Sequence, residues 1–416
     1  MAKLESGAAT EWRRYWKVPA AAGLGYSISV IHVYSLGAFM EPLQNEFGWS
    51  RAEASVGLTI VGMASAVAAL PVGLMVDRLG PRRVGLMGVV LMAVAFALLS
   101  TTTGSLPNWI LLWALISFAS FWVQTTVWTS AVASRFETSR GLAFAVTLSG
   151  GSLAAAIFPP LATAFIGEFG WRGAFLGLGM MWGALVVVVV FLCFRSAHNE
   201  VPAPAAAVQE LPVPELPGVT LREGLQSATF YKLLLAAGLF AFTTLGVVVH
   251  LVPILRDAGT EPLAAAGTAS LFGIFSIVGR LGVGVLLDRF SGRVVGACAY
   301  LVPIGGAALL LFDGTNPVSQ TAAAALFGLT LGAEVDVIAY LASRHFGLKS
   351  FGGLFGGLVG ALSLGTAFGP LAAGAASDRF GGYASFLVLT IILMAASSLM
   401  LASLKEAPDW AQTAAA

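Results

Sequence analysis

Apolar runs long enough to cross a membrane recur along almost the whole chain. A helix needs about 20 predominantly apolar residues to span the hydrocarbon core. Of the 416 residues, 57% are hydrophobic and only 10% are charged, whereas a soluble domain carries roughly 25% charged residues. We therefore predict an all-α polytopic membrane protein. Twelve spans are expected, at residues 18–42, 54–76, 84–103, 107–133, 141–166, 172–194, 231–256, 264–287, 293–312, 318–343, 352–376 and 384–404.

One segment interrupts this series and divides the chain. Residues 195–230 contain VPAPAAAVQELPVPELPG, and proline recurring with alanine and glutamate is typical of an extended, semi-rigid linker. The linker separates two bundles of six spans each, at 18–194 and 231–404. A polar N-terminus at 1–17 and a short tail at 405–416 complete the predicted organisation.

Basic residues in the short loops predict the orientation, because cytoplasmic loops carry an excess of Lys and Arg. With twelve spans, 17 of the 22 Lys and Arg residues fall on the side of both termini and the linker. We therefore expect the termini and the linker in the cytoplasm. The opposite side carries only Arg51, Arg172, Arg256 and Arg379.

The two halves repeat a short motif at the end of their second span. Gly73 begins GLMVDR, which ends with Asp77 and Arg78. Gly284 begins GVLLDR, which ends with Asp288 and Arg289. Parallel six-span repeats place the solute path near the midplane, at the interface of the repeats.

These motifs resemble a known family of transporters. The run from Gly73 to Arg83, GLMVDRLGPRR, matches G-x-x-x-D-R-x-G-x-R-R, the signature loop of the major facilitator superfamily. Three further runs resemble the monocarboxylate transporter and oxalate/formate antiporter branch: residues 34–55, 139–160 and 328–347. The resemblance implies a twelve-helix transporter that works as a functional monomer. It also implies that Asp77, Arg78, Asp288 and Arg289 control conformation rather than bind solute.

Arg280 lies in the middle of the eighth span, where an arginine is costly and in membrane proteins usually marks a functional site. Its guanidinium forms a fixed donor fork that suits a carboxylate. In the family that the chain resembles, an arginine on this helix holds the substrate carboxylate, which implies that role for Arg280. The alternative is a structural ion pair with a neighbouring helix. Ser276 stands one turn earlier, where proton-coupled lactate carriers of the family often have aspartate, so the proton site is left open.

Two further positions lie on the first span. His32 titrates near neutral pH and could relay a proton or bind substrate, and the family often has a lysine close to this point. The alternative is a histidine hydrogen-bonded to a neighbouring helix. Tyr34 either lines the cavity or packs against another helix.

An aromatic face is predicted on the fourth span. Gln124 and Trp128 recur at helical spacing with Ser117 and Phe121, so a continuous helix would place them on one side. That face either binds a flat or apolar substrate body or simply packs. Two more tryptophans near the outer end are expected in an aromatic belt, namely Trp109 and Trp113.

Acidic residues and a histidine mark two further helices. Glu334 and Asp336 lie within the tenth span, and two such carboxylates would not both stay ionised in lipid without partners. In the family that the chain resembles, GAExD is typical of members with different substrates, which implies a structural or gating network rather than substrate selectivity. A proton shared by the pair and a direct substrate role are the alternatives. At the outer end of the seventh span, His250 and Asp257 either form a gate or proton entry, or simply end the helix.

The leading functional hypothesis is a secondary active transporter in the inner membrane that moves a small organic anion by alternating access, with proton symport. The alternative is uptake of a planar nutrient such as riboflavin or an aromatic acid. A sensor that does not transport is a third class. No enzyme motif is found, and neither a cofactor nor a metal site is expected. A net charge of +1 gives no reason to expect a nucleic-acid partner.

Overall fold

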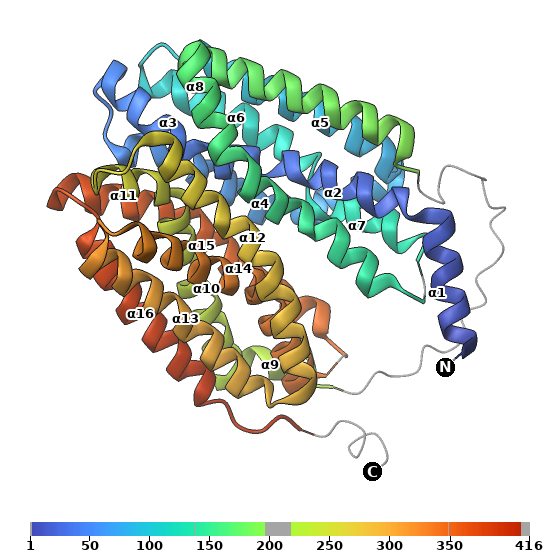
Figure 1. Ribbon diagram of the computed structural model, residues 1–416. Coiled ribbons are helices and arrows are strands. Elements are labelled where there is room, and N and C mark those ends of the chain that lie inside the picture. The colour runs from blue at the N-terminus through green and yellow to red at the C-terminus, as the bar shows by residue number, and fades with distance from the viewer. Residues whose placement is uncertain (1, 137, 196–217, 348, 409–416) are drawn as a thin grey trace. The chain divides into compact units, whose positions relative to one another are not determined.

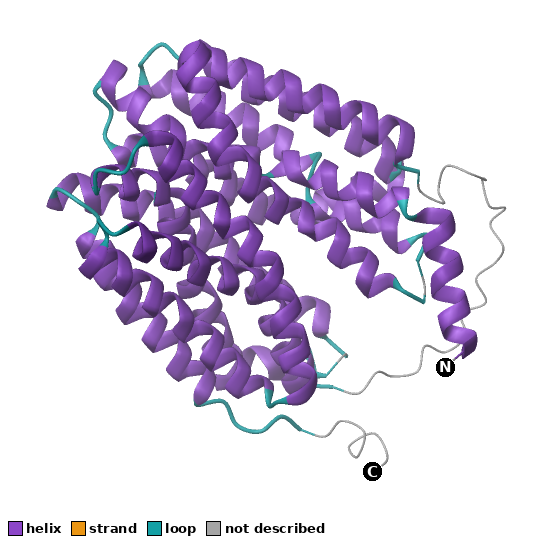
Figure 2. Ribbon diagram, viewed as in Figure 1, coloured by secondary structure: helices purple, strands orange, loops and turns teal. Residues whose placement is uncertain are grey.

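A computed structural model describes residues 2–136, 138–195, 218–347 and 349–408. Apart from an isolated antiparallel bridge between Gly218 and Gly347, the regular structure of these residues is helical (Figure 2). An all-helical chain is expected in a membrane, because helices satisfy their backbone hydrogen bonds internally where no water is available.

The helices before the linker, labelled in Figure 1, follow the predicted spans closely. The first and fourth predicted spans are each made of two helices, while α8 covers both the fifth and the sixth. The elements are α1 (Ala2–Tyr15), α2 (Lys17–Ser29), α3 (Ile31–Phe47), α4 (Arg51–Leu79), α5 (Pro81–Leu98), the 3₁₀ turn η1 (Leu99–Thr101), α6 (Leu106–Phe121), α7 (Thr125–Ala133) and α8 (Arg140–Cys193).

Residues 196–217 of the predicted linker lie outside the described part of the structure. Within the remainder of its range, residues 221–226 form a short helix, so the prediction of an extended chain is wrong there. The Thr220 backbone N–H and hydroxyl both donate to Glu223 at the start of that helix, and these bonds lower the pKa of the Glu223 carboxyl. The elements are α9 (Leu221–Gln226), α10 (Ala228–Val249), α11 (Leu251–Asp257), α12 (Pro262–Arg289), α13 (Gly292–Asp313), α14 (Pro317–Phe346), α15 (Phe351–Phe380) and α16 (Ala384–Ala402).

Ten helical segments in the described residues are long and apolar enough to cross a membrane. One of them is α8, whose backbone is not helical at Gly170 (φ 67°, ψ 170°), so it contains two helices at 140–169 and 171–193. Helix α4, with 29 residues, corresponds to the second predicted span. Each of the twelve predicted spans therefore has a helical counterpart.

Contacts divide the chain into two compact units. Unit 1 contains Met1–Pro204 and Pro262–Gly273, and unit 2 contains Ala205–Glu261 and Ile274–Ala416. Within unit 1, α8 packs against α2, α3 and α5, and α4 packs against α6. Within unit 2, α10 packs against α15 and α16, and α13 packs against α14 and α16.

The same glycine contact occurs in both units. In unit 1, a Cβ at Gly150 of α8 would lie 1.8 Å from the Gly23 carbonyl oxygen of α2. In unit 2, a Cβ at Gly365 of α15 would lie 2.4 Å from the Gly238 carbonyl oxygen of α10. Gly238 follows Gly23 by 215 positions in the sequence, and Gly365 follows Gly150 by the same 215 positions. The first and fifth spans of each half therefore meet backbone to backbone, as parallel repeats require.

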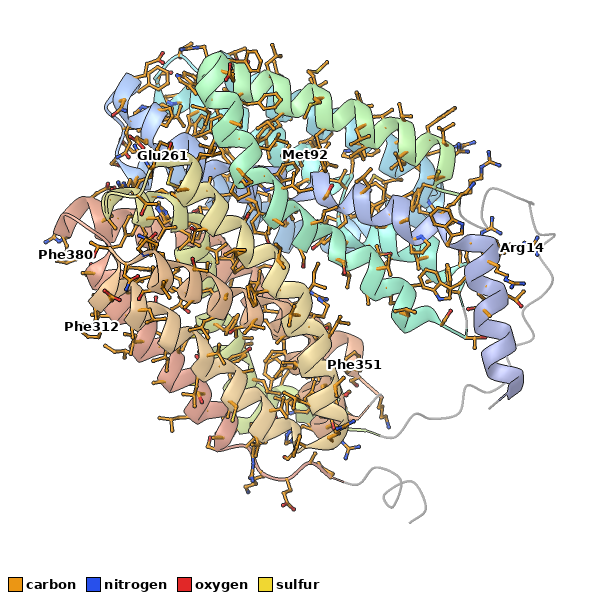
Figure 3. The ribbon with its side chains drawn as sticks, viewed as in Figure 1. Arg14, Met92, Glu261, Phe312, Phe351 and Phe380 are labelled. Atoms are coloured by element: carbon orange, nitrogen blue, oxygen red, sulfur yellow. The ribbon has the colours of Figure 1, made fainter. Side chains whose placement is uncertain are left out.

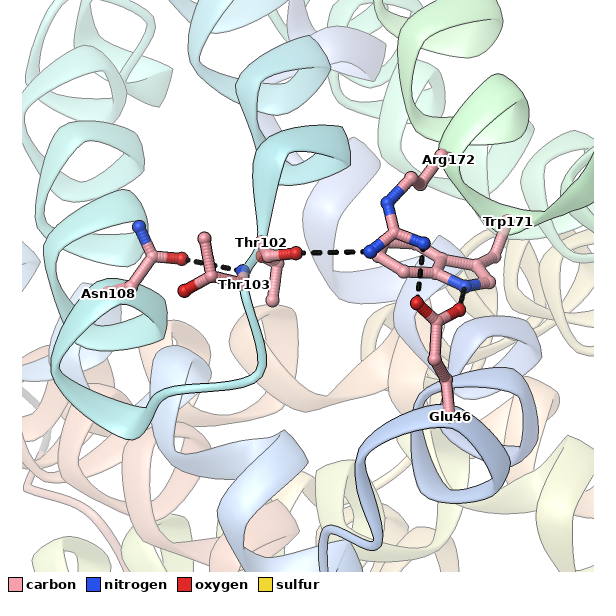
Figure 4. Close-up of polar contacts among 6 residues, drawn as sticks. All are labelled: Glu46, Thr102, Thr103, Asn108, Trp171 and Arg172. Carbon is pink, nitrogen blue, oxygen red and sulfur yellow. Dashed lines mark hydrogen bonds and ion pairs between the residues drawn. The ribbon is translucent and has the colours of Figure 1, made fainter.

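A polar cluster holds one end of unit 1 together (Figure 4). The Glu46 carboxylate at the end of α3 accepts hydrogen bonds from the Trp171 indole and the Arg172 guanidinium. Arg172 also donates to the Thr102 carbonyl oxygen at 3.3 Å. The turn at Gly170 thus connects α8 to α3 and to the segment that follows η1.

Candidate substrate and ion-coupling site

Within unit 2, the part of α12 from Ile274 onwards approaches α14 closely around Arg280. A Cβ at Gly279 of α12 would lie 1.8 Å from the Leu329 carbonyl oxygen, and a Cβ at Gly332 of α14 would lie 1.8 Å from the Ser276 carbonyl oxygen. Real side chains cannot occupy such positions, so both contacts require glycine. These glycines bring the α12 backbone against α14 and thereby set which α14 side chains Arg280 can reach.

Asp336 of α14 is the side chain that Arg280 meets. Its carboxylate oxygen Oδ1 lies 3.9 Å from the Arg280 Nη1, which is at the outer limit of a direct ion pair. The two side chains are 21% and 36% exposed. The Arg280 Nε is buried without a hydrogen-bond partner. The guanidinium is therefore only partly satisfied by Asp336 and keeps donor capacity for another acceptor.

A second acidic side chain on α14, Glu334, is placed differently. Glu334 is 5% exposed, and its Oε1 has no hydrogen-bond partner. On the adjoining helix α13, the hydroxyl of the fully buried Tyr300 is also without a partner. Ser276, predicted near Arg280, is 2% exposed on α12. Unit 2 thus contains a partly exposed acid paired with Arg280 and a separate, buried acid.

This arrangement can bind an anion and move a proton. An incoming carboxylate can compete with Asp336 for the donors of Arg280. A buried carboxylate that loses its cation partner is costly, and protonation removes that cost. Among the described residues, no group of three or more His, Cys, Asp or Glu side chains could hold a metal ion.

His250 lies at the junction of α10 and α11 and is fully buried. Its Nε2 lies 2.9 Å from the Pro370 carbonyl oxygen of α15, and its Nδ1 lies 2.6 Å from the Tyr383 hydroxyl. Because a carbonyl only accepts, Nε2 carries the hydrogen and Nδ1 accepts from tyrosine in the neutral ring. His250 therefore connects the α10–α11 junction to α15 and to the start of α16. Asp257 is exposed at the end of α11.

In unit 1, His32 is buried beside the ring of Trp113, which was predicted to lie in an aromatic belt at the membrane surface. It is 4% exposed, its Nδ1 lacks a partner, and its ring packs edge-on to Trp113 at 5.9 Å between centroids. Trp109 and Trp113 are both fully buried within the unit, so the aromatic-belt prediction for them is wrong. Tyr34, two residues after His32, is partly exposed.

The predicted aromatic face of the fourth span is interrupted. The chain leaves the helix between α6 and α7, and Gln124 precedes α7 with extended backbone (φ −58°, ψ 155°). The freed Val123 carbonyl accepts from the Trp128 Nε1 at 2.9 Å and from the Ser29 hydroxyl at 2.6 Å. Trp128 has no exposed surface, and its ring fills the space beside Gly25. Trp128 is therefore a packing residue that also satisfies the Val123 carbonyl at the break.

The loop residues of the repeated motif end their helices as predicted. Arg78 is exposed in the last turn of α4, and Arg289 is exposed in the last turn of α12. Asp77 and Asp288 fall in the same helices, but their side chains lie outside the described part of the structure.

Sequence reasoning missed the helix breaks that lie beside the candidate residues. One break is at Val30 (φ −117°, ψ 10°), two residues before His32, another covers residues 122–124, and a third is at His250. Val30 and residues 122–124 include neither proline nor glycine, so turn chemistry gives no local signal at these two breaks, whereas Pro253 lies three residues after His250 and is a local signal for the third. Discontinuous helices commonly build the binding sites of transporters, and in each unit such a break lies at or beside a candidate histidine, His32 in unit 1 and His250 in unit 2.

A model of the Major Facilitator Superfamily matches residues 22–356. The chain belongs to the Major Facilitator Superfamily. Among curated relatives, monocarboxylate transporter 13 of Bos taurus is 30% identical over 385 residues, which cover 91% of this chain and 85% of that protein. The uncharacterised MFS-type transporter YhjX of Escherichia coli is 24% identical and covers 73% of each chain.

Solved structures share the fold of this superfamily member. The nucleoside transporter NupG superposes with a TM-score of 0.73 at 13% identity, covering 93% of this chain and 97% of that one. A bacterial homologue of the lysosomal transporter Spinster gives 0.69 at 17% identity, covering 92% and 95%. At 13% and 17% sequence identity, these similarities show a shared fold only.

Superfamily membership confirms several predictions. The chain is a multi-pass membrane protein with the twelve-helix fold, and it is a transporter of a small-molecule solute rather than an enzyme. The predicted resemblance to monocarboxylate transporters is confirmed by the curated relatives.

Proposed function

We propose that the protein is a secondary active transporter of a small monocarboxylate and that Arg280 binds the carboxylate. The observation that carries this proposal is an arginine within a membrane-spanning helix whose acidic partner, Asp336, lies 3.9 Å away and leaves Nε unpaired. Similarity to monocarboxylate transporter 13 supports the same substrate class. The planar-nutrient alternative has no support from Trp128, whose indole has no exposed surface on which a ligand could stack.

Proton coupling follows from competition for Arg280. A substrate carboxylate that engages the guanidinium displaces Asp336 from its cation. Asp336 then takes up a proton, because an unpaired carboxylate in a membrane interior is costly. Proton and anion therefore travel together. Asp336 of α14 supplies the acidic group for which the proton-coupled relatives use an aspartate on α12, at the position of Ser276. His32 and Glu334 are the other candidate proton carriers.

Substitution of Arg280 tests the binding role. Purified wild-type protein, Arg280→Ala and Arg280→Lys are titrated with lactate, pyruvate and other monocarboxylates in a thermal-shift assay, and uptake is measured in proteoliposomes. Hydrogen bonds to a charged group contribute about 1.5–3 kcal/mol, so Arg280→Ala should weaken binding roughly 10- to 150-fold. Arg280→Lys keeps the charge but loses the fork and should fall between. Arg222→Ala, at an exposed site on α9, is the matched control. Unchanged binding in Arg280→Ala would overturn the assignment.

Substitution of Asp336 separates binding from proton coupling. Asp336→Asn cannot exchange a proton, so proton-driven accumulation should be lost while exchange of labelled for unlabelled substrate continues. The measurement is uptake with and without a pH gradient, compared with exchange at equal pH. Gradient-driven accumulation at the wild-type level would exclude Asp336, and the same assay would then be applied to Glu334→Gln and His32→Gln.

Membrane and orientation belong to the same proposal. Bacterial relatives in Bacillus subtilis and Escherichia coli support a location in the inner membrane. The distribution of Lys and Arg favours cytoplasmic termini. The protein acts as a monomer in this proposal, with each chain containing one complete solute path.

A further inference from the structure

The first helix, α1, is fixed to unit 1 by one of its faces. The Glu11 carboxylate accepts hydrogen bonds from the Thr138 N–H at 2.9 Å and from the Ser139 N–H and hydroxyl at 3.1 and 2.9 Å. Beside it, the Trp12 ring packs on Phe136 at 5.2 Å between centroids. The carboxylate thus caps the N-terminus of α8, and α1 is held in a defined orientation.

The remaining side chains at the end of α1 form a cationic surface. Arg13, Arg14 and Lys17 are exposed, and the Trp16 side chain between them is 53% exposed. Arg14 lies over the Tyr15 ring at 5.3 Å but remains accessible (Figure 3). No acidic residue interrupts the sequence from 12 to 17. Three cations and an exposed indole therefore occupy a stretch of five residues, which we call the α1 basic surface.

This surface lies where a membrane span begins. Lys17 is the first residue of a segment, Lys17–Phe47, that is long and apolar enough to cross the bilayer. Figure 1 shows α1 bending away from the axis of α2 at this junction. Because a span of this length enters the hydrocarbon core, we expect the residues at the first turn of α2 to lie at the depth of the lipid headgroups.

We propose that the α1 basic surface binds anionic phospholipid headgroups in the adjacent leaflet. Cations near an anionic membrane surface are attracted to it, and each contributes independently to binding. An amphipathic indole is favoured at the same depth. A lipid partner fits better than a soluble one because the surface is continuous with the start of the span. Since Glu11 fixes α1 to the N-terminus of α8, bound lipid would hold this connection in place.

Brominated lipids, which quench nearby tryptophan fluorescence, test the proposal. Full-length protein is reconstituted into vesicles of phosphatidylglycerol and phosphatidylcholine in equal amounts, with bromine on one lipid or the other. The Trp16 signal is the difference between wild type and Trp16→Phe. We expect quenching of Trp16 to be at least two-fold stronger with brominated phosphatidylglycerol, and 0.5 M salt to reduce that preference because screening shortens the range of the attraction.

The triple variant Arg13→Gln, Arg14→Gln and Lys17→Gln should abolish the preference, while Arg222→Gln, at an exposed cation on α9, should retain it. The three single variants provide the same test, each with a partial loss, if the triple variant does not reconstitute. Equal quenching by the two lipids in the wild type would overturn the proposal, as would a preference that survives in the triple variant. Absence of quenching by either lipid would show that Trp16 does not reach the membrane, which also overturns it. Failure of the Arg280 assays would leave these outcomes unaffected.

Discussion

At Gly332, the absence of a side chain lets two membrane helices touch. The contact between its Cα and the Ser276 carbonyl of α12 leaves no space for a methyl group. Arg280 lies one turn further along α12, and Asp336 lies one turn further along α14. Small residues at helix interfaces allow this kind of approach in membranes. The position of the Arg280–Asp336 pair is therefore decided by residues that carry no charge.

A methyl group at position 332 should separate the pair. Gly332→Ala must push α12 from α14, and overpacking of this kind costs about 1–3 kcal/mol. We expect a lower apparent melting temperature and weaker monocarboxylate binding in thermal-shift assays. Gly282→Ala on α12 is the control, because a Cβ there meets nothing within 4 Å. Equal melting temperatures for the two variants would show that the close approach is not required.

At the scale of elements, the fourth span shows how side chains can satisfy a carbonyl that a break in a membrane helix exposes. Residues 122–124 leave the helix, and the Val123 carbonyl then lacks its usual partner. Trp128 and Ser29 both donate to that oxygen. Backbone irregularity inside a membrane protein is tolerated only when such groups are satisfied. The two donors come from α7 and α2, so the break also connects these helices.

Removing both donors should cost more than the sum of the single changes. Trp128→Phe keeps most of the ring and loses the N–H, and Ser29→Ala loses the hydroxyl, each at about 0.5–1.5 kcal/mol. Each single variant leaves the carbonyl one donor, whereas the double variant leaves a buried acceptor without one. Apparent stability of the four proteins in a double-mutant cycle measures this coupling. Strict additivity would show that the two donors act independently.

A hydrogen bond between the Tyr383 hydroxyl and His250 joins the α10–α11 junction to the start of α16. Tyr383→Phe removes the donor to Nδ1 of the buried His250, and loss of a partner at a buried polar group costs about 1–3 kcal/mol. We expect a lower melting temperature for this variant. Tyr231→Phe on α10, where the tyrosine is 54% exposed, should leave stability unchanged. If the two variants melt alike, His250 does not need this hydrogen bond.

At the scale of the whole molecule, the repeat is carried by backbone contacts as well as by sequence motifs. The Gly23–Gly150 contact in unit 1 has its counterpart in Gly238–Gly365 of unit 2. Parallel repeats of six spans require an even number of crossings between the two termini of each half. Both ends of the chain and the linker should therefore lie on one side of the membrane.

Cysteine labelling tests this topology. In a Cys193→Ser, Cys298→Ser background, which removes both native cysteines, single cysteines replace the exposed residues Thr103 and Glu406. A membrane-impermeant maleimide added to intact cells should label Thr103→Cys, whereas Glu406→Cys should react only after permeabilisation. The reverse pattern would invert the orientation, and labelling of both would contradict an even number of spans.

The sequence alone determined the spans, the all-helical class, the superfamily and the place of Arg280 within a membrane helix. These follow from local properties, because a helix in lipid satisfies its own backbone and has to be apolar for about 20 residues. The repeated Asp–Arg motifs are likewise contained in short segments. The breaks at Val30 and at 122–124 have no comparable local signal, whereas the break at His250 is followed by Pro253.

The contacts of the buried polar and aromatic groups, in contrast, are set by how the helices pack in three dimensions. Periodicity does not distinguish Asp336 from Glu334 as the partner of Arg280, because the choice depends on how the glycines of α12 and α14 align the two helices. The burial of Trp113 and Trp128 depends in the same way on helices distant in the chain. Such contacts are set by packing between helices, which the periodicity of one helix does not specify.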